Sequence, residues 1–188
     1  MDSDESLVRA YRKGDQTALE ALVYKYTRHL YNFVRQYARA GQDAEDIVQE
    51  TFIKAWKHFG KFDATKSFKT WLFTIARNTL IDSMRKRRET PFSDRENEDG
   101  DLLDIPDDRA ELPEEAFAAL EEKESVRRAL LALPPRAREV LLLYYQNDLN
   151  FREIAEVTRE PIDTVKSRHR RALQALKKVF ADRAPKEG

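Results

Sequence analysis

The stretch that decides the fold is FREIAEVTREPIDTVKSRHRRALQALKKVF, residues 151–180. Its two ends have the apolar spacing of helices, and the short REP segment at 159–161 joins them. On the first helix Ile154, Ala155 and Val157 are predicted to face a core. On the second helix the predicted core residues are Ile162, Val165, Ala172, Leu173, Leu176 and Val179. This arrangement is typical of a helix-turn-helix.

The second helix carries polar and basic residues in the part that a recognition helix presents to the major groove. Arginine and lysine can bond guanine edges, while serine and further arginines can hold phosphates. An ordinary helix with a solvated basic face fits the same pattern. The candidate DNA contacts are Lys166, Ser167, Arg168, Arg170 and Arg171.

Helical spacing continues outward from this motif, and no stretch alternates like a strand. Asp15 and Ser67 are candidate N-caps, and Asp163 has the same property. Gly41 is predicted to end the helix that Asp15 begins, and a DAED segment at Asp43 resembles a capping box. The predicted helices are 15–39, 43–59, 67–88, 114–133, 136–147, 151–158 and about 163–180. The predicted fold class is all-α.

The composition excludes several classes of function. The chain has 188 residues, of which 41% are hydrophobic and 36% charged, and it has no cysteine. This excludes disulfides, thiolate catalysis and cysteine-ligated zinc. Its three histidines lie far apart in sequence, which argues against a metal site. The short apolar runs and acidic N-terminus predict no membrane insertion, no signal peptide and a cytoplasmic location.

The charges balance overall, with 34 basic and 34 acidic side chains, but they are unevenly placed. Residues 1–88 hold 17 basic and 11 acidic side chains, residues 89–126 hold 3 and 15, and residues 127–188 hold 14 and 8. Periodicity is also lost between Glu89 and about Pro113. We therefore expect two small helical domains, 1–88 and 114–188, joined by an acidic flexible linker at 89–113.

Four segments in order resemble the extracytoplasmic-function (ECF) sigma factors of the sigma-70 family. DAEDIVQETFIKAWKHFGKFD (43–63) is similar to their polymerase-binding segment, and SFKTWLFTIARNTLIDSMRKRR (67–88) to their promoter −10 segment. LPPRAREVLLLYY (133–145) and DTVKSRHRRALQALKK (163–178) resemble the helix before the helix-turn-helix and the −35 recognition helix. Arg159 and Asp163 depart from the family, which often has a small residue or glycine there.

The resemblance implies a dissociable sigma subunit that directs core RNA polymerase to promoters and helps to melt them. Its implied partners are promoter DNA, an anti-sigma factor and the clamp and flap of the polymerase. On the residues alone, an ordinary exposed polar face is the favoured explanation for the first of the implied contacts. Those contacts, on the clamp, are Asp46, Gln49, Glu50, Phe52 and Ile53, of which all but Phe52 share one helix face by their spacing.

The resemblance also implies that the loop at 60–66 captures a flipped base of the −10 element and that Asn78 reads this element. Single strands need aromatic platforms and phosphate contacts, although the aromatic residues near this loop could equally belong to a core. The candidates for −10 DNA binding are Phe62, Lys66, Phe68, Trp71, Arg77, Asn78, Arg85, Arg87 and Arg88.

The residues indicate no catalytic site, no cofactor and no metal, because no nucleophile–base pair or glycine-rich phosphate loop stands out. We therefore expect that the polymerase performs the chemistry. Two alternatives are a free-standing helix-turn-helix regulator and a hydrolase or nuclease with a DNA-binding tail. The first does not need a polymerase-binding helix, and the second needs clustered ligands that the sequence lacks.

Overall fold

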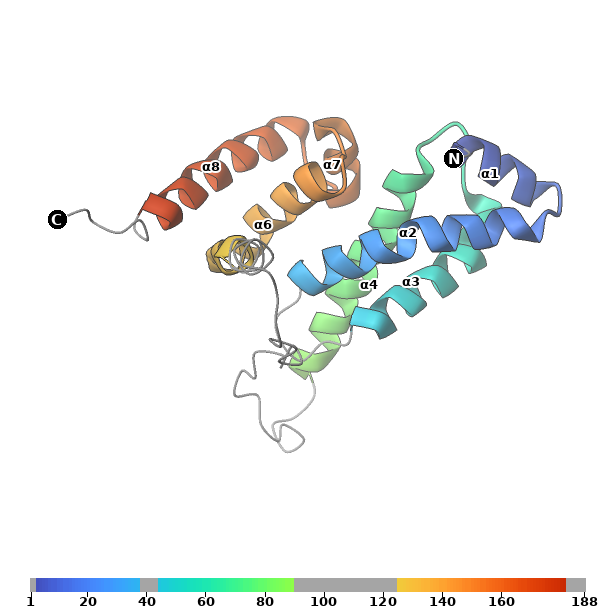
Figure 1. Ribbon diagram of the computed structural model, residues 1–188, viewed down its shortest axis with the longest axis horizontal. Helices are drawn as coiled ribbons and strands as arrows, with labels where there is room; N and C mark the ends of the chain where they lie inside the picture. The colour runs from blue at the N-terminus through green and yellow to red at the C-terminus, as the bar shows by residue number, and fades with distance from the viewer. Residues whose placement is uncertain (1–2, 38–43, 90–124, 182–188) are drawn as a thin grey trace, which may run out of the picture.

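The computed structural model describes residues 3–37, 44–89 and 125–181 (Figure 1), and within these ranges it contains helices and no strand. We call α1 to α4 the N-terminal unit and residues 125–181 the C-terminal unit. The N-terminal helices are α1 (Asp4–Arg12), α2 (Gln16–Tyr37), α3 (Ala44–His58), η1 (Phe59–Lys61) and α4 (Phe68–Glu89). The C-terminal unit has a helix at 125–132, then α6 (Pro135–Leu141), η3 (Leu142–Gln146), α7 (Phe151–Thr158) and α8 (Ile162–Ala181). Residues 114–124 of the helix predicted at 114–133, like the predicted linker at 90–113, lie outside the described residues. The all-α prediction is confirmed.

Side-chain caps explain where several helices begin. Asp15 Oδ1 accepts a hydrogen bond from the Thr17 amide at 2.9 Å, and Ser67 Oγ accepts one from the Thr70 amide at 3.2 Å. These bonds satisfy amides that have no partner inside the helix. Both predicted N-caps are therefore confirmed, whereas the boundaries predicted at Gly41 and Asp43 lie outside the described residues.

The N-terminal unit is built around aromatic side chains. Helix α2 contributes Phe33, whose ring lies 5.5 Å from that of Phe73 on α4, in an edge-on arrangement. Helix α1 is fastened to α2 by Asp4, which pairs with Lys25 at 2.6 Å and accepts a hydrogen bond from the Tyr26 hydroxyl. The buried aromatic residues of this unit are Tyr26, Phe33, Tyr37, Phe52, Phe59, Phe62, Phe68 and Phe73.

The C-terminal unit contains the predicted helix-turn-helix in α7 and α8. Asn150 caps α7 in a capping box with Glu153, and Arg159 ends it in the left-handed region with φ 56°. Helix α8 begins at Ile162, so Asp163 lies inside its first turn and the prediction that it is the N-cap is wrong. The helix predicted at 136–147 starts at Pro135 and changes to a π-helix over η3.

The two units pack directly on each other. Helix α4 lies against α7, and α2 lies against both α6 and η3 (Figure 1). Buried residues of the C-terminal unit, such as Leu143 and Ile154, belong to the same continuous apolar cluster as Phe33 and Leu72 of the N-terminal unit. This packing brings functional candidates from distant parts of the sequence side by side. Among the helices described, none has the length and apolar character to cross a membrane.

Candidate nucleic-acid and partner interfaces

One face of α3 carries an exposed set of polar residues with an apolar residue among them. Asp46, Gln49 and Glu50 are exposed, and Ile53 is 61% exposed. Their spacing places them on one side of the helix. Glu50 also pairs with Lys54 at 2.7 Å, on the surface. Ile53 is the exposed large apolar side chain on this helix.

Phe52 differs from the other α3 candidates because it is only 9% exposed. Its ring stacks on Trp56 with centroids 6.0 Å apart, and it is part of the core of the N-terminal unit. In this arrangement Phe52 supports the exposed face of α3 from beneath.

The loop before α4 is held in one conformation by short-range bonds. Asp63 Oδ1 accepts hydrogen bonds from the Thr65 amide at 3.0 Å and the Thr65 hydroxyl at 2.8 Å. These bonds lower the pKa of the Asp63 carboxyl. From α1, Arg12 donates a hydrogen bond to the Phe62 carbonyl. The first two residues of the loop predicted at 60–66 belong to η1, and the rest is a turn that α1 supports through Arg12.

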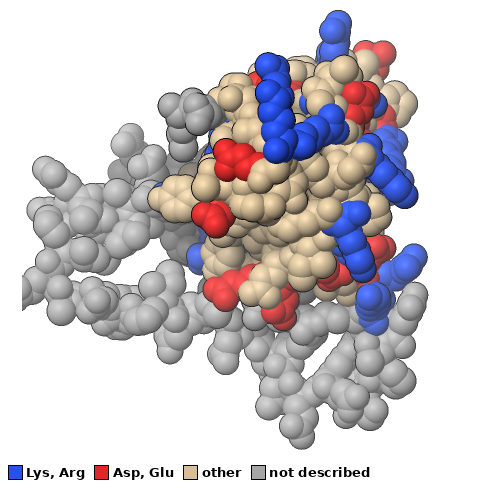
Figure 2. All heavy atoms as spheres, turned by 90° about the vertical axis from the view of Figure 1, so that its right-hand side faces the viewer, with Lys and Arg blue, Asp and Glu red and all other residues tan. Residues whose placement is uncertain are grey.

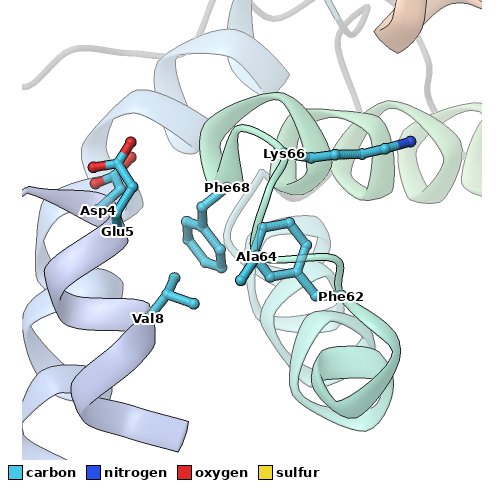
Figure 3. Close-up of a pocket in the computed structure, with 7 residues that line it drawn as sticks. All are labelled: Asp4, Glu5, Val8, Phe62, Ala64, Lys66 and Phe68. Carbon is cyan, nitrogen blue, oxygen red and sulfur yellow. The ribbon is translucent and has the colours of Figure 1, made fainter.

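A small depression lies between this loop and the start of α1 (Figure 3). Val8 and Phe68 point into it from opposite sides, and the carboxylates of Asp4 and Glu5 lie at its α1 edge. The Lys66 side chain extends away from these carboxylates along the outside of α4. Lys66 is exposed and is free to approach a phosphate.

The aromatic candidates beside the loop form a packed cluster. Phe62 and Phe68 are 4% and 3% exposed, and Trp71 is half-buried. The ring of Trp71 lies 4.8 Å from Phe62 and 5.7 Å from Phe68. Phe62 and Phe68 are therefore core residues in this arrangement, which is one of the two roles that the sequence allowed. Trp71 has the most accessible ring of the three.

The other −10 candidates lie along α4. Arg85 is exposed and Asn78 is half-buried. The side chains of Arg87 and Arg88 lie outside the described residues. Arg77 is directed toward the C-terminal unit, where its Nε donates to Glu139 Oε1 at 2.6 Å.

The Arg77–Glu139 pair is buried between the two units. Its side chains are 15% and 1% exposed, respectively. Burial raises the pKa of the Glu139 carboxyl, and the positive charge of Arg77 only partly opposes that shift. Glu139 Oε2 is buried and has no hydrogen-bond partner among the described residues. The charge of Glu139 is therefore stabilised chiefly from one side, by Arg77.

Most of the −35 candidates on α8 are accessible. Lys166, Arg170 and Arg171 are exposed, and Ser167 is half-buried. Arg168 differs because both of its terminal nitrogens donate to the carboxylate of Glu160, in the turn between α7 and α8. The geometry therefore holds Arg168 against the turn, while Arg171 donates to the carbonyl and the hydroxyl of Ser167 on its own helix.

Some residues at the contact between the units were not singled out from the sequence. Arg138, Glu139 and Glu153 bond to α2 or α4 across that contact. Arg138 and Glu139 occupy positions where the helical period of Leu142 and Leu143 predicts buried residues. A charged residue at a helix position that the apolar spacing predicts to be buried is the signal by which Arg138 and Glu139 could have been found.

Charge on the outer end of the N-terminal unit is mixed. Lys and Arg side chains are most numerous along the upper and right-hand edges of the face in Figure 2, and Asp and Glu side chains are scattered over it.

Two family models match the chain, one in each unit. The model described as Sigma-70 region 2 matches residues 22–90, which include α3 and α4. The model described as Sigma-70, region 4 matches residues 123–176, which include the helix-turn-helix.

Relatives match nearly the whole chain. It is 34% identical over 178 residues to the ECF RNA polymerase sigma factor SigW of Bacillus subtilis, covering 93% of this chain and 95% of that protein. It is 34% identical over 184 residues to the RNA polymerase sigma-H factor of Pseudomonas aeruginosa, covering 95% and 94%.

Two solved structures share the fold. The structure of CnrH in complex with the cytosolic domain of CnrY has a TM-score of 0.70 and 26% identity, covering 97% of this chain and 100% of that chain. The sigma factor RpoE of Bartonella quintana, in complex with the anti-sigma factor NepR, has a TM-score of 0.65 and 25% identity, covering 87% and 96%.

Proposed function

This chain belongs to the ECF sigma factors of the sigma-70 family, and we propose that it binds core RNA polymerase through α3 and promoter DNA through α4 and α8. It is a promoter-recognition subunit, and a free-standing regulator is not favoured because both sigma regions are present. Transcription requires the catalytic centre of the polymerase, so we assign no enzymatic step to this chain. We place its domains at 1–88 and 114–188, joined by the linker at 89–113.

The observation that carries this proposal is the α3 face. Asp46, Gln49, Glu50 and Ile53 are exposed together on one side of the helix. A partner that buries Ile53 gains apolar burial, and the polar residues around it give the contact a fixed orientation. Phe52 is proposed to hold this face in place from the core.

The test is co-elution with purified bacterial core RNA polymerase in gel filtration. We expect the wild-type chain to co-elute and both Ile53→Asp and the triple variant Asp46→Ala, Gln49→Ala, Glu50→Ala to elute alone. The matched control is Glu20→Ala, an exposed carboxylate on α2. If the wild-type chain elutes alone while still binding duplex DNA, the polymerase role is wrong.

The DNA contacts are proposed to differ between the units. In the N-terminal unit, Lys66, Arg77 and Arg85 would contact phosphates of the −10 element with Arg87 and Arg88, while Asn78 and the turn at 60–66 read bases beside Trp71. Phe62 and Phe68 would support this turn. In the C-terminal unit, Lys166, Ser167, Arg170 and Arg171 would contact the −35 element, and Arg168 would first have to leave Glu160.

We also propose an anti-sigma partner. A solved relative of the same fold was captured with an anti-sigma factor, and the exposed α3 face offers such a protein the same surface that the polymerase would use. Competition between the polymerase and this partner for Ile53 would then regulate the subunit. The proposal predicts that Ile53→Asp weakens both interactions.

A further inference from the structure

The turn between α7 and α8 fixes one carboxylate in place. Glu160 lies between Pro161 and Arg159, which ends α7 in the left-handed region at φ 56°. A proline restricts the residue before it to extended conformations, and the Glu160 amide donates to the Ala155 carbonyl at 3.1 Å. These restraints leave the backbone at Glu160 little freedom. The turn therefore holds the Glu160 carboxylate at a defined place beside α8.

Both oxygens of this carboxylate bond to Arg168 on α8. Arg168 Nη1 donates to Oε2, and Arg168 Nη2 donates to Oε1 at 3.1 Å. The two side chains are only 15% and 17% exposed. Arg136, at the start of α6, lies 3.6 Å from the same Oε1, but its side chain is 73% exposed. A bidentate pair with little solvent around it is stronger than a surface ion pair, so Glu160 restrains Arg168 far more than Arg136.

Arg168 also differs from the other basic residues of α8 in its place on the helix. Lys166 and Arg170 are exposed and four residues apart, so they share one outward face. Val165 and Ala172, which lie one turn to either side of Arg168, are buried. Arg168 therefore leaves the helix at the border between the core and the outward face. From this border a long, flexible side chain can reach either the turn or a phosphate beside the helix.

The pair with Glu160 reduces the positive charge that α8 offers to DNA. Lysine and arginine attract the phosphates of any sequence, and this attraction supplies most of non-specific binding. A guanidinium whose terminal nitrogens donate to a carboxylate does not donate them to a phosphate as well. A promoter competes with a large excess of other sites, so recognition depends on the ratio of specific to non-specific affinity. Lower non-specific affinity raises that ratio.

We propose that Glu160 is a specificity-determining residue of the helix-turn-helix. It holds Arg168 and thereby lowers the affinity of α8 for duplex DNA of arbitrary sequence. Arg168 reaches a phosphate only where the other contacts of a promoter compensate for the loss of its pair with Glu160. This inference rests on the proposed function, because it takes α8 as the helix that contacts the −35 element.

The first test measures binding of the full chain to a labelled, mixed-sequence DNA duplex by fluorescence anisotropy at several salt concentrations. Glu160→Gln keeps the shape of the side chain and removes its charge, so that Arg168 is released. One further phosphate contact increases the loss of affinity between about 50 and 200 mM salt by about 3.5-fold. We expect this increase in Glu160→Gln, together with tighter binding at the low-salt end. The matched control Glu156→Gln removes a charge from an exposed position on α7 and is expected to keep the wild-type salt dependence.

The second test asks whether the gain comes from Arg168. We expect Arg168→Gln to weaken binding to the same duplex more in the Glu160→Gln background than in the wild-type background. The reason is that Arg168 contacts phosphate only when it is released, and a double-mutant cycle isolates this coupling. A purely structural role of Glu160 in the turn would instead lower DNA affinity in Glu160→Gln and would leave the salt dependence unchanged.

A measurement on the wild-type chain does not depend on the folding of any variant. Nitrogen NMR of the arginine side chains follows each guanidinium during titration with the mixed-sequence duplex. We expect the Arg168 signal to stay in place while the Arg170 signal shifts. The proposal is overturned if both signals shift alike, if Glu160→Gln has the salt dependence of its control, or if Arg168→Gln has the same effect in both backgrounds.

Lys166→Ala separates this inference from the proposed function. If Lys166→Ala weakens duplex binding while Glu160→Gln behaves like its control, α8 binds DNA and the role given to Glu160 is wrong. If Lys166→Ala binds the duplex like wild type, the proposed −35 contact is wrong, and this inference falls with it. Co-elution with core polymerase tests the polymerase role independently of both.

Discussion

The N-terminal and C-terminal units bury their side chains in different ways. The N-terminal unit has a core of its own, in which aromatic rings from α2, η1 and α4 contact one another. The C-terminal unit has a separate apolar cluster of its own, whose buried residues are Leu133, Leu141 and Ala172. Seven further buried apolar residues of this unit join the cluster of the N-terminal unit: Val140, Leu142, Leu143, Leu149, Ile154, Val157 and Val165.

The two units therefore depend to different degrees on the contact between them. A unit with its own core retains most of its stability when the contact opens, whereas a unit that shares its core exposes apolar surface. The C-terminal unit therefore gains more from the packed arrangement. Its separation from the N-terminal unit therefore needs a replacement surface, which core polymerase could supply.

The largest effect is expected from the core of the N-terminal unit. Phe33→Ala removes a fully buried ring that stacks on Tyr37 at 5.9 Å, and we expect it to lower the free energy of unfolding by about 3–5 kcal/mol. Leu141→Ala, in the separate cluster of the C-terminal unit, should lower the free energy of unfolding by about 2 kcal/mol. Urea unfolding followed by circular dichroism measures both. Equal losses would contradict the proposed inequality of the two cores.

The next largest effect should come from Arg138, which is 2% exposed and ties the units together. Its guanidinium donates to backbone carbonyls at the end of α2 and at the end of the helix at 125–132, and to the carbonyl of the residue after that helix. These are the carbonyls of Gln36, Tyr37, Leu130, Leu131 and Leu133. Arg138→Met should cost about 2–4 kcal/mol, because it leaves several buried acceptors unsatisfied.

A neighbouring arginine provides the control for this prediction. Arg136 has a side chain that is 73% exposed, so Arg136→Met should change the free energy of unfolding by less than about 0.5 kcal/mol. If Arg138→Met splits the urea transition into two, the arginine couples the units. A single transition at an unchanged midpoint would show that Arg138 does not connect them.

Local signals in the sequence predicted much of the fold, but they did not predict the long-range contacts. Asp15, Ser67 and Pro135 mark helix starts because capping depends on neighbouring residues. The exposed α3 face also follows from helical spacing alone. The partner of Arg77, however, is 62 residues away, and no local pattern determines which basic residue meets a buried carboxylate.

The aromatic candidates show the same limit. Phe62 and Phe68 are aromatic, as residues that stack on bases are, but they are buried like core residues. Their packing on Phe59 and Trp71 distinguishes the core role from the stacking role. The change to a π-helix at Leu142 was also missed, because the sequence there continues a helical period without a glycine or proline. Tertiary packing decided both cases.

A smaller and opposite effect is expected in the turn of the helix-turn-helix. Arg159 has φ 56°, a region where the Cβ of an ordinary residue is strained and glycine is not. Arg159→Gly should stabilise the C-terminal unit by about 1 kcal/mol, whereas Arg159→Ala should bring no gain because it keeps the Cβ. Thermal unfolding of both variants measures the difference. A gain in both variants would place the effect in the arginine side chain.

The smallest effect concerns His169, which connects the recognition helix to the rings of the C-terminal unit. Its imidazole lies 4.8 Å from Tyr144 and 5.1 Å from Phe151, centroid to centroid, and its Nε2 is buried without a hydrogen-bond partner in the described residues. Burial lowers the pKa of this imidazole below its ordinary value of 6.5. The unfolded chain therefore takes up the proton first as the pH falls.

Folding stability from His169 is thus complete above pH 6.5 and is lost as the pH falls through the lower pKa of the folded state. We expect the urea midpoint of the C-terminal unit to decline as the pH falls below 6.5, and His169→Phe to flatten part of that decline. The decline should be confined to the C-terminal unit, because the rings around His169 belong to η3 and α7. An equal decline in the N-terminal unit would mean that the units unfold together and that the shared core makes them one cooperative body.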